Sequence, residues 1–166
     1  MSGNIPVRVR WMIRRDLPAV LAICQQCDAE FQTEEDLYDL LRDRRTVGMV
    51  AEHTETGEVC GVMVYELSKS EMNLKLFAVS ISHRWGGVCR QMDACLTEKL
   101  RVTHRERIYA DVPAELVSLQ VCLRSLGWRA MQILDTPDGE YYRFEKRAQT
   151  ESPCVNRITG MLQKGG

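Results

Sequence analysis

The chain has 166 residues, of which 45% are apolar and 27% charged, the ordinary composition of one globular domain. Its formal net charge of -1 argues against a dedicated nucleic-acid binder, because such domains are usually basic. No apolar run reaches the length of a membrane span, and the first residues lack the apolar stretch of a signal peptide. We therefore expect a cytoplasmic protein without nucleic-acid or membrane partners.

The N-terminal part of the sequence predicts one strand and two helices. Apolar residues with a period of two over 7–13 favour a strand. A helix is expected to run to about Cys27, with Asp16 as its N-cap. Thr33-Glu-Glu-Asp36 resembles a capping box with aspartate in place of glutamate, and leucines at helical spacing over 37–41 follow it.

The rest of the chain alternates strands and helices. Apolar runs over 47–52 and 59–67 flank Thr56-Gly57 and predict a hairpin. The further elements expected are a strand over 74–79, a helix over 88–100, a strand over 108–112, a helix over 116–126 that ends at Gly127, and strands over 129–134 and 140–145. This order predicts an α/β domain with a mixed sheet over 1–147. The polar segment over 148–166 has no period and is expected to be a flexible tail.

Seven cysteines are scattered along the chain, an odd number that does not suit a disulfide framework. In a reducing compartment they are expected to act as small buried residues. Cys24-Gln-Gln-Cys27 has the spacing of a redox or metal pair, but it falls within a predicted helix and has no second such pair to complete a metal site. We expect no metal, and a thiol redox protein is an alternative that this pair leaves open.

Adjacent glycines, Gly86 and Gly87, lie between the predicted strand over 74–79 and the next helix. Backbone N–H groups at a helix start, together with the positive end of its dipole, bind anions such as a pyrophosphate. Arg84 and Arg90 flank the loop and can add charge-assisted hydrogen bonds. The alternative is an ordinary strand-to-helix turn in which glycine serves backbone geometry alone. Loop composition does not separate the two interpretations.

The context of this loop carries a family resemblance. Phe77-Ala-Val79, followed by Arg84-Trp-Gly-Gly-Val-Cys-Arg90, resembles the acetyl-CoA signature of the GCN5-related N-acetyltransferases (GNATs), Arg/Gln-x-x-Gly-x-Gly/Ala. Ser125-Leu-Gly-Trp-Arg-Ala130 is similar to the family's turn into its sixth strand, and the order of elements also matches. Within the family the chain is most similar to ribosomal-protein alanine N-acetyltransferases. The resemblance implies a mixed, mostly antiparallel sheet of six to seven strands flanked by four helices.

The resemblance also implies acetyl-CoA as the co-substrate. Its acetyl and pantetheine arm is expected along the backbone of Phe77, Ala78 and Val79, and its pyrophosphate in the glycine loop. The loop residues to which the resemblance assigns cofactor contact are Arg84, Trp85, Gly86, Gly87, Val88, Cys89 and Arg90. The implied acceptor is a peptide, a protein N-terminus or a small amine, and the chain is expected to be a monomer or homodimer.

The chain departs from the family pattern at several positions. Cys89 replaces the second glycine, which is tolerated if the position is helical. A reactive thiol is the alternative, because helix N-termini lower the pKa of a thiol. Asp111 corresponds to the relatives' glutamate base and is one methylene shorter. Leu116 and Leu123 replace a cofactor-contacting asparagine and a general-acid tyrosine, and Phe31-Gln32 replaces a Pro-Trp pair.

These residues predict an acetyl-CoA-dependent N-acetyltransferase in which the amine attacks the thioester directly in a ternary complex. Asp111 is expected to accept the proton through water, although a strand-end carboxylate with no catalytic role is its alternative. A lysine amine with a pKa of about 10.4 loses its proton at a cost about 3.5 kcal/mol above that of an α-amine. A shortened base therefore favours α-amines or other weakly basic amines. The alternative function is a non-catalytic acyl-CoA-binding or interaction module on the same scaffold.

Overall fold

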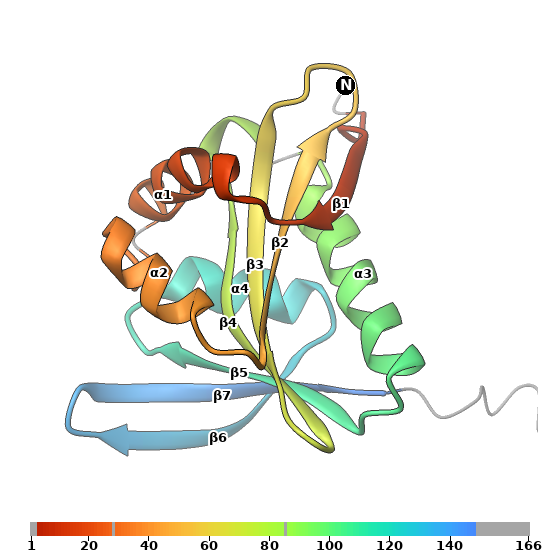
Figure 1. Ribbon diagram of the computed structural model, residues 1–166. Helices are drawn as coiled ribbons and strands as arrows, with labels where there is room; N and C mark the ends of the chain where they lie inside the picture. Colours follow the sequence, from red (N-terminus) through yellow and green to blue (C-terminus); the bar gives the residue numbers. More distant parts are fainter. Residues whose placement is uncertain (1–2, 28, 85, 149–166) are drawn as a thin grey trace, which may run out of the picture.

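The computed structural model describes residues 3–148 except 28 and 85. Within these residues, four α-helices cover a seven-stranded mixed sheet (Figure 1). The elements are β1 (Val7–Trp11), the short 3-10 helix η1 (Arg14–Asp16), α1 (Leu17–Gln26), α2 (Glu34–Leu41), β2 (Thr46–His53), β3 (Val59–Leu67), β4 (Glu71–Val79), η2 (Ile81–His83), α3 (Val88–Val102), β5 (Arg107–Pro113), α4 (Val117–Ser125), β6 (Arg129–Thr136) and β7 (Gly139–Arg147). The predicted order of strands and α-helices and the α/β fold class are confirmed.

The sheet consists of two halves that part at its middle. Its strand order is β1-β2-β3-β4-β5-β7-β6, and β4 and β5 are its parallel neighbours. These two strands pair from Glu71 with Arg107 to Asn73 with Tyr109. Beyond that point they diverge: β1 to β4 stand upright in Figure 1, whereas β5, β7 and β6 run across its lower part. The divergence leaves an opening beside the second half of β4.

Apolar side chains pack on both faces of the sheet. On one face α3 and α4 bury residues such as Leu96 and Leu123, and on the other α1 and α2 bury Val20 and Leu37. Along β5 every second residue is buried, as expected for a strand whose side chains alternate between two faces. Ala110 faces the core under α3 and α4, so its neighbour in the chain points to the opposite face.

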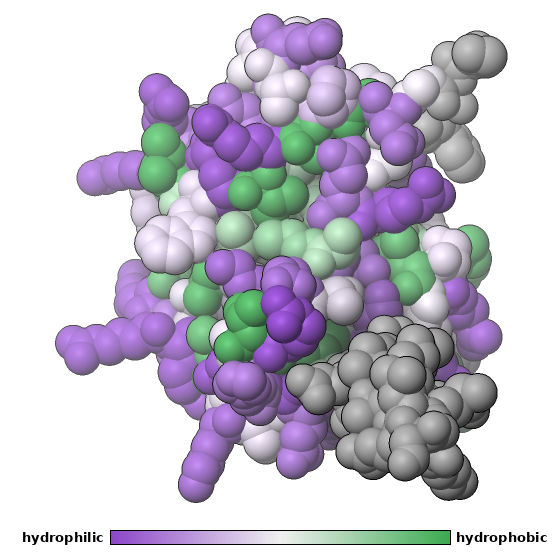
Figure 2. All heavy atoms as spheres, turned by 90° about the vertical axis from the view of Figure 1, so that its right-hand side faces the viewer, coloured by the Kyte–Doolittle hydropathy of each residue, from purple (hydrophilic) through white to green (hydrophobic). Residues whose placement is uncertain are grey.

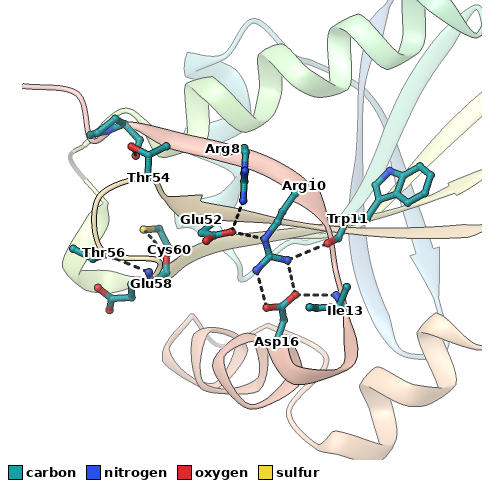
Figure 3. Close-up of polar contacts among 11 residues, drawn as sticks. Arg8, Arg10, Trp11, Ile13, Asp16, Glu52, Thr54, Thr56, Glu58 and Cys60 are labelled. Atoms are coloured by element: carbon teal, nitrogen blue, oxygen red, sulfur yellow. Dashed lines mark hydrogen bonds and ion pairs between the residues drawn. The ribbon is translucent and has the colours of Figure 1, made fainter.

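The connection from β1 to α1 differs from the prediction at Asp16. Its carboxylate does not cap α1, because η1 precedes that helix and the backbone of Asp16 is already helical. Instead it accepts hydrogen bonds from the Ile13 N–H at 2.8 Å and from both terminal nitrogens of Arg10, at 2.8 and 2.9 Å (Figure 3). Arg10 also pairs with Glu52 on β2. The side chain of Asp16 is 4% exposed, so this charge is buried with a matched partner.

Two other local predictions hold. The N–H of Asp36 donates to the Thr33 hydroxyl at 3.1 Å, and the N–H of Thr33 donates to the Asp36 carboxylate at 3.2 Å, which confirms the capping box. Gly127 follows α4 with a φ of 93°, a left-handed conformation that favours glycine.

Strand β4 begins at Glu71, earlier than predicted, because the polar residues of its first half still pair with β3.

Figure 2 shows the face that lies on the right of Figure 1, where α3 runs. Hydrophilic residues dominate its outline, and apolar residues form small groups between them. This is the ordinary surface pattern of a protein in water. In the part of the chain that the structure describes, we find no helix with the length and apolarity needed to cross a membrane.

Candidate functional site

A cavity of about 710 Å³ lies where β4 and β5 diverge. Its walls come from the segment between α1 and α2, the second half of β4, the loop before α3, the end of β5, and α4. The volume falls within the range of cofactor-binding pockets, roughly 300–1,000 Å³. The opening in the sheet therefore holds a ligand-sized space.

The backbone of β4 is exposed to this cavity at alternate residues. The N–H of Ser80 donates to the carbonyl of Cys60 at 2.8 Å, so by the alternation of an antiparallel ladder Ala78 also faces β3. The N–H and C=O groups of Phe77 and Val79 then point away from β3, into the gap beside β5. In agreement, the Val79 carbonyl accepts a hydrogen bond from the Cys27 thiol at 3.3 Å. A ligand can pair with this strand edge as an extra strand would.

The start of α3 adds a second set of backbone donors. The first helical bond runs from the N–H of Gln91 to the Gly87 carbonyl at 3.2 Å, so the N–H groups of residues 88–90 precede the hydrogen-bond ladder. Such groups, with the helix dipole behind them, favour an anion. Arg84 and Arg90 line the same cavity and add positive charge. The loop thus places backbone donors and two arginines at the cavity, and anion binding there stays a prediction.

The two glycines have a reason in backbone geometry, the alternative that the sequence left open. The N–H of Ile5 donates to the Gly86 carbonyl at 2.7 Å, and a Cβ atom on Gly86 would collide with the Ile5 side chain. Gly87 has a φ of 73°, and a Cβ atom there would lie 2.5 Å from the Asn4 amide oxygen. The close approach of the N-terminal segment and the left-handed turn therefore account for glycine at these two positions. A clash between a Cβ atom and a ligand is not needed to explain them.

The predicted cofactor residues separate into two groups. Phe77, Ala78, Val79, Arg84, Gly87, Cys89 and Arg90 line the cavity. Gly86 and Val88 are buried and pack away from it, Val88 in the core beneath α3. Trp85 lies outside the described residues.

Cys89 lies in the first turn of α3, where φ is negative, so a side chain is tolerated as expected. Its thiol is not the activated one, however. A hydrogen bond with the Cys122 thiol, followed by burial, raises the pKa of Cys89. The same hydrogen bond lowers the pKa of Cys122. The expected effect of the helix N-terminus on Cys89 is outweighed, because a thiol that donates a hydrogen bond is stabilised in its protonated form.

Asp111 lies at the edge of the cavity and is held by a cation. Arg143 on the neighbouring strand β7 donates to both carboxylate oxygens, at 2.7 and 2.9 Å. The guanidinium carbon of Arg143 lies 4.6 Å from the centre of the Tyr109 ring, so this ring packs against the guanidinium group. Sequence reasoning missed Arg143, since its position opposite Asp111 follows from the β5–β7 register.

A second cavity of about 400 Å³ adjoins the first. Both cavities are lined by Glu30, Phe31, Leu74, Lys75 and Asp111. The second is also lined by Asp39, Leu40, Asp43, Thr46, Glu66, Asn73 and Tyr141. The negative charge of Glu30 raises the pKa of Tyr141. Asp111 therefore lies between the two cavities. The larger one runs along β4, and the smaller, more polar one lies on the side of α2.

The positions at which the chain departs from the family form a mostly apolar wall. Leu123 is fully buried and Leu116 partly so, and both line the larger cavity. Phe31 lines both cavities, whereas the Gln32 amide bonds to the Cys24 and Ala29 carbonyls and shapes the segment before α2. Packing thus explains the two leucines.

The structure gives no support to a redox or metal role for Cys24 and Cys27. Both thiols are free, and burial raises the pKa of Cys24 to about 12. Cys27 instead ends α1 at the cavity wall. Within the described residues no group of three or more potential ligands is placed to hold a metal ion.

Neither a known protein-family model nor any curated protein sequence matches the chain. Solved structures do match. Ard1 from Thermoplasma volcanium is 21% identical with a TM-score of 0.75, over 87% of this chain and 99% of that one. The ribosomal-protein-S18-alanine N-acetyltransferase from Escherichia coli is 18% identical with a TM-score of 0.72, over 89% and 97%.

A spermidine N-acetyltransferase from Vibrio cholerae, solved in complex with CoA and spermine, is 14% identical with a TM-score of 0.70, over 87% of this chain and 97% of that one. At these identities the likeness concerns the fold. It extends over nearly the whole described part of the chain and nearly the whole of each matched structure. The chain has the fold of the GCN5-related N-acetyltransferases, as its signature between β4 and α3 predicted.

Proposed function

We propose that this chain binds acetyl-CoA in the cleft between β4 and β5 and transfers the acetyl group to a primary amine. One observation carries the proposal: the exposed backbone edge of Phe77 and Val79 leads directly to the N–H groups at the start of α3. An arm with amide groups can pair with the strand edge. A pyrophosphate suits the helix start and its two arginines. The fold of known N-acetyltransferases supports the assignment.

Acetyl-CoA supplies the acetyl group as a thioester, and the amine attacks it directly without an acyl-enzyme. The Val79 N–H, directed into the gap, is positioned to polarise the carbonyl of the bound thioester. Asp111 accepts the proton of the amine through water, and Arg143 fixes the orientation of that carboxylate. No side chain is needed to protonate the leaving sulfur, because a thiol has a pKa of about 8.5. An apolar residue at Leu123 is compatible with this chemistry.

The acceptor enters through the second cavity and reaches Asp111 from the side of α2. An acceptor with a weakly basic amine, such as a peptide α-amine or a small amine, suits a short base that acts through water. A lysine side chain would first have to lose a proton from an amine with a pKa of about 10.4. Orientation of the amine against the thioester then provides most of the rate acceleration, because it can lower the activation free energy by roughly 7–11 kcal/mol.

A non-catalytic acyl-CoA-binding module is the second candidate. It is favoured by Leu116 and Leu123, which give the cavity an apolar wall at both positions where relatives carry polar groups. Such a module would bind the cofactor and release no CoA when amines are added.

Amine-dependent release of CoA separates the two functions. Acetyl-CoA would be incubated with the chain and with peptides of free N-terminus, lysine peptides of blocked N-terminus, or polyamines. Free CoA would be separated by chromatography, because the chain's own seven cysteines would react with a thiol reagent. CoA release with free peptide N-termini or small amines supports the transferase. Affinity without release supports the binding module, and the absence of affinity contradicts both. Saturating activity on lysine side chains alone would contradict the preference for α-amines.

A further inference from the structure

The gap between β4 and β5 has two sides that differ in the residues facing them. On β4, Phe77 packs in the core under α3 and α4, whereas Ala78 packs under α1 and α2. On β5, Ala110 and Val112 pack on the side of α4, and Asp111 between them faces the opposite side. A thioester held along β4 would therefore have α4 on one side and the proposed base on the other.

Apolar side chains line the larger cavity on the side of α4. We call this group the apolar pocket, and its residues are Phe77, Ala110, Val112, Leu116, Leu119 and Leu123. Val112 and Leu123 are 1% and 0% exposed, so the cavity borders the core here. Leu116 and Leu119 are only partly buried, which leaves apolar surface that a ligand can cover. Ser118 and Ser125 also line the cavity, but they are exposed and lie toward its mouth.

The backbone carbonyls at the end of β5 are already hydrogen-bonded within the protein. The Gln120 amide donates to the carbonyls of Pro113 at 3.1 Å and Ala114 at 2.9 Å. The N–H of Leu116 also donates to the Pro113 carbonyl, at 3.0 Å. A polar ligand group in the apolar pocket would lose its hydrogen bonds with water and find these acceptors occupied. A hydrocarbon group has no such bonds to lose and gains by burial.

We propose that the apolar pocket holds the acyl chain of the bound thioester, and that this protein prefers butyryl-CoA to acetyl-CoA. The inference rests on the proposed function and extends it to longer acyl groups. The acyl chain points from the β4 edge toward α4, while the amine approaches from the side of Asp111. A longer acyl chain therefore leaves the path of the acceptor open.

The transfer step is the same for each acyl group. The amine nitrogen forms a bond to the acyl carbon, and the bond from that carbon to sulfur breaks. The proton of the amine passes through water to Asp111, and CoA leaves as a thiolate. Leu116 and Leu123, which stand where related enzymes carry polar residues, then have a role besides packing: they give the acyl chain an apolar wall.

The test measures the affinity of the full-length protein for acetyl-, propionyl- and butyryl-CoA by calorimetry. No amine is added, so the thioester is not consumed. Burial of one methylene group is expected to raise the affinity about fourfold. Butyryl-CoA should therefore bind roughly tenfold more tightly than acetyl-CoA, with propionyl-CoA between them.

Two variants test whether the apolar pocket is the source of this preference. Leu116→Asn adds a polar group to the pocket at the N-cap of α4, where asparagine is favourable. Leu119→Trp fills part of the pocket without a polar group. Each should lower the ratio of butyryl-CoA to acetyl-CoA affinity by roughly fivefold. Val117→Asn is the control, because Val117 is 60% exposed and lies outside the cavity wall, and its ratio should equal that of the unmodified protein.

The outcomes separate this inference from the proposed function. If acetyl-CoA is turned over with an amine and longer acyl groups bind no better, the inference is overturned and the proposed function stands. If butyryl-CoA binds more tightly and no amine releases CoA, the pocket is supported and the transfer is contradicted. Failure of all three thioesters to bind contradicts both. A butyryl-CoA preference that persists in Leu116→Asn and Leu119→Trp would contradict the location of the acyl chain.

Discussion

Asp111 illustrates how a single side chain acquires its setting from strands far apart in the sequence. On β5 it faces away from the core under α3 and α4, and at that face it meets Arg143 of β7. The two hydrogen bonds with Arg143 leave the outer lone pairs of the carboxylate available to water. A residue in this position can orient a water molecule between itself and an amine. Arg143 is then a positioning residue.

Replacement of Asp111 tests its role as a base. Asp111→Asn retains the size of the side chain and removes its ability to accept a proton. Turnover with the best amine is expected to fall by roughly 10²–10⁴-fold while the affinity for CoA stays unchanged, because the cofactor is proposed to lie along β4. Steady-state kinetics and calorimetry with CoA measure the two effects. Unchanged turnover would remove Asp111 from the mechanism.

Arg143→Lys supplies the matched control for this carboxylate. Lysine keeps the positive charge beside Asp111 but cannot form the paired hydrogen bonds of a guanidinium. We expect an intermediate loss of kcat with unchanged CoA affinity, because the carboxylate is oriented less firmly. A kcat equal to that of the unmodified chain would contradict a positioning role for Arg143.

At the scale of elements, ion pairs and hydrogen bonds hold the connections around β1 and α3 in place. Asp16, Arg10 and Glu52 tie the entry of α1 to β2 through buried or partly buried charges. The hydrogen bond from Arg10 lowers the pKa of Asp16. The N-terminal segment likewise closes over the glycine loop through Ile5 and Asn4. The loop that is proposed to bind phosphate is therefore supported by residues at the start of the chain.

Acid should weaken the network at Asp16. Because its pKa is lower in the folded chain than the unfolded value of about 3.9, its contribution is complete above that pH and is lost as the pH falls through the folded value. Asp16→Asn should reduce the free energy of unfolding at neutral pH by roughly 2–3 kcal/mol. It should also flatten the dependence of stability on pH below about 5. Urea unfolding at a series of pH values measures both.

Asp43→Asn provides the comparison for this prediction. Arg45 lowers the pKa of Asp43 through a similar pair, but that pair is exposed to water. Its loss should change stability at neutral pH very little. Equal losses in the two variants would contradict the account of Asp16 as a buried and matched charge.

The effect of a Gly87 substitution on stability can be measured separately from its effect on ligand binding. Gly87→Ala and Gly139→Ala both place a side chain at a positive φ, 73° and 124° respectively. Gly139→Ala is expected to cost about 1–2 kcal/mol of stability. Gly87→Ala is expected to cost more, because its Cβ atom would also lie too close to the Asn4 amide oxygen. Gly87 lines the cavity beside α3, whereas Gly139 lies in the β6–β7 turn. Calorimetry should therefore show weaker CoA binding for Gly87→Ala alone, and equal CoA affinities would contradict the proposed location of the pyrophosphate.

At the scale of the whole molecule, local patterns predicted the elements well and their contacts poorly. Apolar periodicity and turn residues placed the strands and helices because these signals act within a few residues. Asp16 was misassigned, since its partner Arg10 competes for the carboxylate. The pair Asp111–Arg143 joins residues more than thirty positions apart. Only strand register and helix packing bring such residues together.

The family signature indicated what local patterns could not, a strand edge and a loop that border the same cavity. It correctly indicated the strand edge at Phe77 and Val79, whose outward-facing groups depend on the divergence of β4 from β5. It did not indicate that Gly86 and Val88 pack away from the cavity. Those two positions follow from contacts with Ile5 and with the core, which the signature does not describe.

Main-chain N–H groups of β4 and the start of α3 are proposed to hold CoA. Residue-resolved amide hydrogen exchange, with and without CoA, measures these groups one by one. Exchange is expected to slow on CoA addition at Phe77, Val79, Val88, Cys89 and Arg90, with Ala78 unchanged because its N–H already faces β3. CoA binding that leaves these amides unaffected, or no binding at all, would contradict this proposal.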